Sequence, residues 1–490
     1  MKINPSLTEF KRLAKQGNLI SVWSEYLADT DTPVSVYLKL RNSLGSLSFL
    51  LESAEFGKGM GRYSFIGCDP FLLVLIYESE VEVWNGTAKE HFNGSNPLEA
   101  LRAITRDMVA TGPHLGIPFE GGLVGYLNYD VIRKWERLPD LRPYGRGMPE
   151  AVFMAPRRVV VFDHLTHKIT VMYQVYLDEK KDAESQFGLA VETIIETIRI
   201  LQASLPSEGR DIRVSSLFPN MEKPQFEQMV CRAKRYIEAG DVIQVVLSQR
   251  FSGKASGDSF GLYRRLRSLN PSPYMFYLDF GQTKLIGSSP EVLVRLTDST
   301  INLRPIAGTR PRGKSEEQDK LLEYELLADE KERAEHVMLV DLGRNDVGRV
   351  AAPGSVRVNK FMEVERYSHV MHLVSDIEGR LRPDKDCFDV FMSAFPAGTV
   401  TGAPKVRAME IINELEACPR GPYAGAVGYF GFNGNMDFCI TIRTIVMMDD
   451  ELWVQAGAGI VYDSVPEKEY EETLKKARAL IKAMEEPEWE

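Results

Sequence analysis

The sequence has few cysteines and no long apolar run. Its 490 residues include five cysteines, at positions 68, 231, 387, 418 and 439, and no two of them form a CxxC pair. A disulfide framework and a structural zinc site are therefore not indicated, and we expect a protein of the reducing cytoplasm. The longest obvious apolar run is 71–77, well short of the roughly 18 residues that a membrane-spanning helix needs. The first 30 residues contain no apolar segment followed by a small-residue cleavage site, so we expect neither secretion nor membrane insertion.

A basic excess is also missing. The chain has 59 Lys and Arg against 69 Asp and Glu, a formal charge of −10. This balance argues against nucleic-acid binding, because phosphate recognition usually leaves a basic excess. The sequence lacks GxxxxGK[ST] and any GxGxxG after a strand, so ATP and dinucleotide binding are not supported. With 44% hydrophobic and 26% charged residues, the composition is that of an ordinary globular protein.

Periodicity places the main boundary in the segment 203–224, which is rich in Pro, Ser and Gly. We therefore predict an N-terminal α+β region, 1–210, and a C-terminal region, 211–490. Strands followed by helices in irregular order favour an α+β fold over a doubly wound one. The predicted helices are 183–201, 225–239, 316–342 and 466–484. The predicted strands are 46–51, 71–77, 158–162, 169–176, 242–248, 427–432, 438–447 and 452–454.

Two predicted helices carry glutamates three residues apart. Glu332 and Glu335 share one helix face, and Glu469 and Glu472 repeat the spacing in the last helix. If these helices face each other, their carboxylates form an oxygen-only site suited to Mg²⁺. The same spacing is also typical of a solvated helix face paired with Lys or Arg.

Two histidines, His369 and His372, lie in an apolar, strand-like run. One of them could be a buried proton carrier, or equally a hydrogen-bonded core residue. Glycine-containing turns at 287–291, 305–309, 397–402 and 456–459 could let backbone N–H groups approach an anion, although each is also compatible with an ordinary turn.

The order and wording of these segments together resemble the chorismate-utilising enzymes. The strings that carry the resemblance are DVIQVVLSQRF (241–251), GSSPE (287–291), RPIAGTRPRG (304–313), EHVMLVDLGRNDVG (335–348), HVMHLVS (369–375), PAGTVTGAPK (396–405), the 423–443 block, and AGAGI with EKEYEET (456–473). They span about residues 225–485. The resemblance implies antiparallel β-sheets packed in a sandwich with flanking helices.

Within that family, two positions favour the branch that makes anthranilate from chorismate and ammonia. Isochorismate and salicylate synthases carry a water-activating lysine where this chain has Gln244, which is neutral and cannot act as a base. Aminodeoxychorismate synthases typically carry a nucleophilic lysine where this chain has Ala307. His372 stands where the anthranilate-forming enzymes remove a proton.

The resemblance also implies roles for the other site residues. Mg²⁺ would be bound by Glu335 and Glu472, with Glu332 and Glu469 in supporting positions. Glu291 would act as the proton donor and His372 as the base. The remaining residues would bind the chorismate dianion: Gly308, Thr309, Thr399, Tyr423, Arg443, Ala458, Gly459 and Lys476.

A second resemblance lies outside this core, in LLES (50–53) and NPSPYMFY (270–277). Both strings are similar to segments through which tryptophan inhibits these enzymes, although core packing would also suit their apolar content. The residues implied for this site are Leu51, Glu52, Ser53, Pro273, Tyr274, Met275, Val427 and Tyr429.

No segment resembles a glutaminase, so ammonia derived from glutamine would have to come from an amidotransferase partner subunit. We expect a heterotetramer of two chains of each kind. Two alternatives stay open: a relative that forms aminodeoxyisochorismate or aminodeoxychorismate, and a non-catalytic tryptophan-binding subunit.

Overall fold

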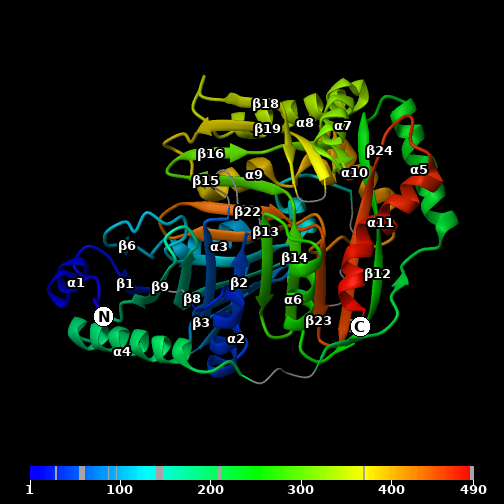
Figure 1. Ribbon diagram of the computed structural model, residues 1–490. Coiled ribbons are helices and arrows are strands. Elements are labelled where there is room, and N and C mark those ends of the chain that lie inside the picture. Colours follow the sequence, from blue (N-terminus) through cyan, green and yellow to red (C-terminus); the bar gives the residue numbers. More distant parts are fainter. Residues whose placement is uncertain are drawn as a thin grey trace.

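The computed structural model describes residues 1–27, 30–53, 61–86, 88–94, 96–139, 147–206, 211–367 and 370–485. Strands occupy the middle of the molecule and helices lie around them (Figure 1). No helix in these ranges is long and apolar enough to cross a membrane. His369, one of the two histidines singled out in the sequence, lies outside the described residues.

The N-terminal half contributes a series of strands. The longest pair is β3 with β8, which run antiparallel from Tyr63↔Asp163 to Ile76↔Ala151. Apart from β1 with β6, the pairings among the described strands are antiparallel. The strands of this half are β1 (Leu19–Leu27), β2 (Ser48–Glu52), β3 (Tyr63–Ile76), β4 (Glu80–Trp84), β5 (Lys89–Asn93), β6 (Ala110–Thr111), β7 (Gly122–Leu127), β8 (Ala151–Asp163) and β9 (Lys168–Tyr176).

The C-terminal half contributes a second series, in which β12 pairs with β24 and β19 pairs with β16, β17 and β18. Its strands are β10 (Arg213–Val214), β11 (Phe218–Pro219), β12 (Gln244–Ser256), β13 (Tyr274–Asp279), β14 (Thr283–Ser289), β15 (Val292–Thr297), β16 (Thr300–Leu303), β17 (Ile306–Pro311), β18 (Arg357–Arg366), β19 (Val370–Arg380), β20 (Gly402–Ala403), β21 (Ala426–Gly431), β22 (Met436–Ile440), β23 (Thr444–Met448) and β24 (Glu451–Ile460).

Strands from the two halves are interleaved. The N-terminal strand β2 pairs with β13, and β7 pairs with β21. The sheets therefore contain strands from both 1–210 and 211–490. The domain boundary predicted at 203–224 does not separate one sheet from another and stays a prediction.

Helices cover the outside of the sheets. They are α1 (Leu7–Leu13), α2 (Pro33–Leu44), α3 (Pro97–Thr105), η1 (Tyr129–Lys134), α4 (Ala183–Gln202), α5 (Lys223–Glu238), α6 (Phe260–Leu269), α7 (Glu316–Ala328), α8 (Glu330–Gly348), α9 (Cys387–Ala394), η2 (Gly398–Val400), α10 (Lys405–Leu415) and α11 (Pro466–Met484). The α+β class is confirmed. So is the last helix, which begins at Pro466, where the missing N–H costs little.

Several sequence predictions were wrong in detail. The helix predicted at 316–342 is two helices, because Asp329 adopts an extended conformation and its side chain caps α8. The strand predicted at 438–447 is interrupted between β22 and β23, where Arg443 has a φ of 50°. The segments 306–309 and 456–459, predicted to be turns, lie within β17 and β24.

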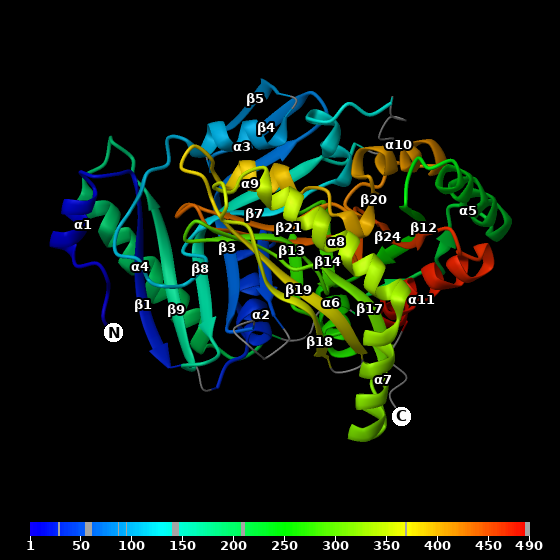
Figure 2. The same ribbon diagram turned by 90° about the horizontal axis from the view of Figure 1, so that it is seen from above.

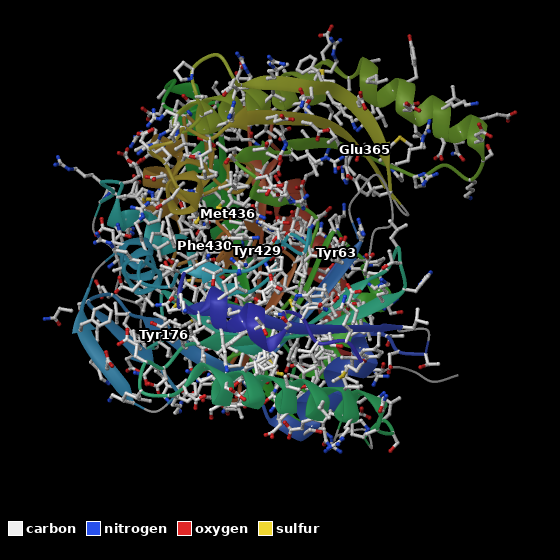
Figure 3. The ribbon with its side chains drawn as sticks, turned by 90° about the vertical axis from the view of Figure 1, so that its left-hand side faces the viewer. Tyr63, Tyr176, Glu365, Tyr429, Phe430 and Met436 are labelled. Carbon is white, nitrogen blue, oxygen red and sulfur yellow. The ribbon has the colours of Figure 1, made fainter. Side chains whose placement is uncertain are left out.

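Apolar clusters lie on both faces of the central strands. Neighbouring residues Tyr429 and Phe430 of β21, labelled in Figure 3, belong to different clusters. Phe430 packs with Met436 and Phe438, whereas Tyr429 lies with Phe65. Because alternate side chains point to opposite faces of a strand, both faces of β21 are covered, as in a sandwich.

A buried ion pair ties β12 to the loops beside it. Arg420 is 1% exposed; it binds Glu416 at 2.7 Å and donates to the carbonyls of Val246 and Val400, each at 2.7 Å. Arg420→Leu would leave the Glu416 carboxylate buried without its partner. We expect the free energy of unfolding to fall by about 3–5 kcal/mol, measured by urea denaturation.

The matched control is Lys254→Met, which removes an ion pair with Asp450 at 2.9 Å that is largely exposed to solvent. This variant should unfold almost as the parent does. Equal losses in the free energy of unfolding of the two variants would contradict the claim that burial makes the Arg420 ion pair the more important one.

Candidate active site

The first pair of glutamates lies on the first turns of α8. The side chain of Asp329 accepts hydrogen bonds from the backbone N–H groups of Lys331 and Glu332, at 3.1 and 3.2 Å, and thereby fixes the start of the helix. Arg310 of β17 binds Asp329 at 2.7 Å and Glu332 at 3.3 Å. The strand thus holds the helix terminus, and Glu332 and Glu335 are both half-buried rather than fully solvated.

The second pair lies on α11. Glu469 and Glu472 are half-buried, whereas Glu467 and Glu471 on the same helix are exposed. Lys476, one turn further on, binds Glu472 at 2.7 Å and donates to the carbonyl of Gly457 in β24 at 3.0 Å. Glu469 and Glu472 are thus less exposed than Glu467 and Glu471, but Glu472, whose side chain is 46% exposed and paired with Lys476, also fits the alternative of a solvated face.

Charged residues of α8 and α11 act on each other's glutamates. Burial and the neighbouring Glu332 raise the pKa of Glu335, and Lys331 and Lys476 oppose that rise. The pKa of Glu469 is likewise raised by burial, with the same two lysines opposing. Each lysine thus acts on a carboxylate of the other helix, and Figure 2 shows the N-terminal end of α8 beside α11.

Gln244 joins β12 to this group. Its amide nitrogen donates to Glu335 at 3.2 Å, and its carbonyl oxygen is buried without a hydrogen-bond partner in the described part of the chain. A Cβ at Gly459 would lie 2.6 Å from that amide nitrogen, so a larger residue there would push the Gln244 amide out of its present position. The adjacent Ala458 packs its methyl group into an apolar cluster, and only its backbone can face a ligand.

His372 of β19 is held in one tautomer. Its Nδ1 lies 2.9 Å from the carbonyl oxygen of Gly308 and 3.1 Å from the Thr309 hydroxyl. A carbonyl only accepts hydrogen bonds, so Nδ1 carries the proton and Nε2 keeps its lone pair. Burial lowers the pKa of His372, which favours the neutral ring. The residue can therefore accept a proton at Nε2.

Glu291 is suited to donating a proton rather than accepting one. Burial raises its pKa to about 7, with Thr399 and Lys476 acting in the opposite direction. A carboxyl group with such a pKa is partly protonated near neutral pH and can donate a proton. Their surroundings thus suit Glu291 to donate a proton and His372 to accept one.

Arg443 and Tyr423 supply a site for an anion. Burial lowers the pKa of the Arg443 guanidinium, and the nearby Tyr423 opposes that shift. A Cβ at Gly457 would lie 2.5 Å from the Tyr423 hydroxyl, so this glycine admits the ring. Arg443 also has a φ of 50°. A strained residue bearing a desolvated cation is typical of a binding site.

The donor set is chemically suited to a hard cation but is not assembled into a cluster. Among the described residues, no three His, Cys, Asp or Glu side chains lie together as metal ligands would. The carboxylate oxygens of α8 and α11 are instead neutralised by Arg310, Lys331 and Lys476. The sequence prediction had not assigned Arg310 or Lys331, although both lie within or beside the resembling strings.

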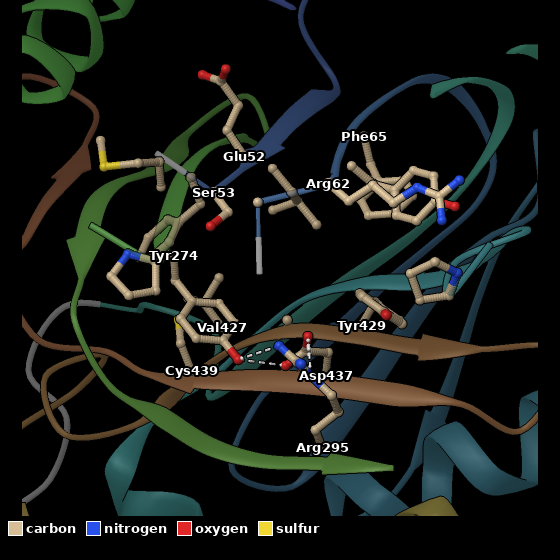
Figure 4. A pocket seen from close by; sticks show the side chains of 18 of the residues that line it. Glu52, Ser53, Arg62, Phe65, Tyr274, Arg295, Val427, Tyr429, Asp437 and Cys439 are labelled. Carbon is tan, nitrogen blue, oxygen red and sulfur yellow. Dashed lines mark hydrogen bonds and ion pairs between the residues drawn. The ribbon is translucent and has the colours of Figure 1, made fainter. Parts of the chain in front are cut away.

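A separate cavity of about 430 Å³ lies between strands of the two halves (Figure 4). Its walls include β2, β3, β13, β15, β21 and β22. All eight residues proposed from the second resemblance line it: Leu51, Glu52, Ser53, Pro273, Tyr274, Met275, Val427 and Tyr429.

The polar groups of this cavity are organised by residues that the sequence prediction missed. Asp437 accepts a hydrogen bond from Tyr274 at 2.8 Å and binds Arg295 at 2.8 Å. The buried Ser53 hydroxyl has no partner among the described residues. Arg62, Tyr63 and Phe65 complete one side. Strand alternation puts Arg295 and Asp437 on one face, but their pairing depends on the register of β15 with β22.

Comparison with known proteins places the whole chain in a family. A family model described as chorismate binding enzyme matches residues 58–482. The chain is 48% identical over 489 residues to anthranilate synthase component 1 of Aquifex aeolicus (strain VF5), covering 99% of this chain and 98% of that protein. It is also 48% identical to the component 1 of Acetivibrio thermocellus, with 98% of each chain covered.

Solved structures give the same picture. Anthranilate synthase component I from Streptococcus pneumoniae TIGR4 superposes with a TM-score of 0.76 at 36% identity, covering 93% of this chain and 98% of that one. The menaquinone-specific isochorismate synthase MenF from Escherichia coli gives a TM-score of 0.73 at 19% identity, with 98% and 99% covered. The latter similarity concerns the fold alone.

The pKa of Glu291 can be tested directly. We expect its carboxyl band in the infrared difference spectrum between the parent and Glu291→Gln to disappear with a midpoint near pH 7, since its pKa is raised to about 7. Because the folded pKa lies above the ordinary value, this group should also destabilise the fold progressively as the pH rises from roughly 4.3 to about 7, with no further loss above that. Glu291→Gln should lack that loss. A midpoint near the ordinary value of roughly 4.3 would contradict the assignment.

Proposed function

The chain belongs to the family of chorismate-binding enzymes, and on that premise we propose that it forms anthranilate and pyruvate from chorismate and ammonia. The observation that carries the proposal is the tautomer of His372, whose Nδ1 donates to Gly308 at 2.9 Å and whose Nε2 is left as a base. Gln244, at the position of a water-activating lysine in other members, supplies no base for water attack.

Two successive steps balance the reaction. Ammonia forms a bond to C2 of chorismate while the C4 hydroxyl leaves as water, with its proton supplied by Glu291. The new ammonium group then loses one proton, which restores the Glu291 carboxyl group. His372 takes the C2 proton as the bond from the ring to the enolpyruvyl oxygen breaks, and the ring becomes aromatic. The released enolpyruvate takes up that proton at its methylene carbon and becomes pyruvate.

The substrate dianion is bound by residues at its pyruvyl carboxylate and at its ring. Arg443 and Tyr423, with a backbone N–H near Gly459, bind the pyruvyl carboxylate, since the planar guanidinium matches a planar anion. Gly308, Thr309 and Thr399 line the ring side, and Lys476 adds positive charge. The locally positive pocket attracts the substrate despite the net charge of −10.

We assign Mg²⁺ as the cofactor, bound by Glu335 and Glu472, with Glu332 and Glu469 in support. The raised pKa values of Glu335 and Glu469 support this assignment. Burial and repulsion disfavour the charged carboxylates, and a bound cation would stabilise them. When bound, the ion neutralises the ring carboxylate and acts as a Lewis acid.

The name component 1 carried by the relatives implies a second component. We propose that this partner is a glutamine amidotransferase that supplies ammonia, in a heterotetramer of two chains of each kind located in the cytoplasm.

We further propose that the 430 Å³ cavity binds tryptophan as a feedback inhibitor. A second cavity, of about 340 Å³, shares the wall formed by Pro273, Tyr274 and Arg295 and is also lined by Pro290 and Val292, the neighbours of Glu291. A ligand that moves this wall would disturb the proton donor. The coupling would be reciprocal and on the order of 1–3 kcal/mol.

Assays of the isolated chain test the reaction. With chorismate, Mg²⁺ and an ammonium salt, we expect anthranilate fluorescence to rise, and with glutamine in place of ammonium no product should form. His372→Ala should still aminate chorismate but accumulate an amino intermediate, because the C2 proton is no longer removed. Loss of a general base typically slows a step by roughly 10²–10⁴-fold.

Other results would point elsewhere. If the parent stops at the amino intermediate, the chain is an aminodeoxyisochorismate-forming relative. If it binds tryptophan and forms no product, it is a regulatory subunit. If His372→Ala forms anthranilate at the parent rate, the assignment of the base is wrong.

Filling the larger cavity tests tryptophan binding. Ser53→Tyr should place a ring in the cavity and weaken tryptophan binding, measured by calorimetry, by at least roughly tenfold, or 1.4 kcal/mol. Activity without tryptophan should be retained, because Ser53 lies outside the catalytic group. Ser53→Ala, which leaves the space open, is the matched control. Unchanged inhibition of Ser53→Tyr would exclude this cavity.

A further inference from the structure

Two buried polar side chains, His336 and Asp346, interrupt the apolar face that α8 packs on the sheet. The buried residues of the helix are His336, Leu339, Val340, Gly343, Asp346 and Val347. Asp346, near the far end of the helix, is paired with Lys405 at 2.9 Å. His336 is 0% exposed and is the member nearest the catalytic end of the helix, directly after Glu335. None of the steps proposed above uses it.

His336 is bonded to a strand that also carries the base. Its Nε2 lies 2.6 Å from the hydroxyl oxygen of Ser375 on β19, which is itself 0% exposed. The same hydroxyl accepts a hydrogen bond from the backbone N–H of Met362 on β18 at 2.9 Å. The backbone N–H of Ser375 donates to Pro305 at 3.2 Å. The contact therefore ties α8 to a network of β18, β19 and the segment before β17.

We propose that the hydrogen bond between His336 and Ser375 positions the first turns of α8 on β19, and so fixes where Glu332 and Glu335 lie relative to His372. This inference rests on the proposed function, since it gives a reason for the placement of the carboxylates in that reaction.

The need for a directional contact follows from how the helix packs. Apolar contacts alone are not directional, and a slip of one turn would move the carboxylates by roughly 5.4 Å. At the far end of the face, Gly343 fixes the approach sterically, because a Cβ there would lie 2.7 Å from Ile377. No such glycine occurs in α8 before Gly343. At the catalytic end the hydrogen bond between His336 and Ser375 fixes the position of the helix. In other proteins, buried polar pairs are known to fix helix register in this way.

The histidine is a poor choice for stability alone. Its Nδ1 is buried with no partner among the described residues, and an unsatisfied polar atom in an apolar interface is destabilising. Burial also lowers the pKa of the ring to about 4, so the ring is neutral and acts only through hydrogen bonding. A leucine would fill this space without the unpaired nitrogen.

Three variants separate positioning from folding: His336→Leu, His336→Gln and Ser375→Ala. Glutamine is the conservative variant, because its amide nitrogen reaches the place of Nε2, whereas leucine removes the bond. His336→Leu should fold and melt close to the parent, yet bind Mn²⁺, measured by electron paramagnetic resonance without chorismate, roughly ten- to a hundredfold more weakly. Its kcat should fall with little change in KM for ammonium, and His336→Gln should recover most of both losses.

A structural measurement tests the inference separately from the reaction. Spin labels on cysteines introduced at the exposed positions Val337 and Arg357, with Cys231→Ser, report the placement of α8 against β18. Their distance distribution should broaden in His336→Leu and match the parent in His336→Gln. A parent that makes no anthranilate would refute the proposed function but leave this measurement valid.

The inference is overturned if His336→Leu keeps the parent distance distribution and Mn²⁺ affinity. It is equally overturned if a folded His336→Gln behaves as His336→Leu does. Should His336→Leu not fold, Ser375→Ala provides the same comparison and the same outcomes decide it.

Discussion

The partial burial of four acidic side chains is the constraint on which the candidate site depends. Glu332, Glu335, Glu469 and Glu472 come from two helices far apart in the sequence, and burial raises the pKa of Glu335 and Glu469. Such a group is stable only when positive charge or hydrogen-bond donors lie between its members. The chain provides them as Arg310 for Glu332, Gln244 for Glu335 and Lys476 for Glu472.

The sheets explain how this site can be influenced from a distance. Strands β2 and β7 of the N-terminal half pair with β13 and β21 of the C-terminal half, and β2, β13 and β21 line the larger cavity. Asp437 and Cys439 of β22 line that cavity, and β22 pairs with β15, the strand that follows Glu291. A hydrogen-bonded sheet transmits displacement along its strands because its register cannot slip without exposing core residues. The larger cavity and the candidate active site thus share elements of the same sheets.

Sequence patterns predicted the parts of the site that are local. The i, i+3 glutamates of α8 and α11 lie on half-buried faces as their spacing indicates, and α11 begins at Pro466 as predicted. The eight residues proposed from LLES, NPSPYMFY and β21 line one cavity. Features that depend on partners from elsewhere in the chain were missed. Arg310 lies within a resembling string but its partners do not, and Lys331 and Arg295 had no sequence signal beyond their charge. The break at Asp329 follows from a cap that competes with continued helix.

The sequence by itself determined the residue types, their spacing on helices and strands, and the family they resemble, because each of these is a property of neighbouring residues. Only the tertiary structure decided which nitrogen of His372 carries the proton, since that depends on the carbonyl of Gly308, 64 residues away. It likewise decided that Glu291 has a raised pKa, since the solvent exclusion responsible for that shift comes from segments distant in the chain. Hydrogen-bond partners and desolvation arise when the chain folds, and no local pattern encodes them.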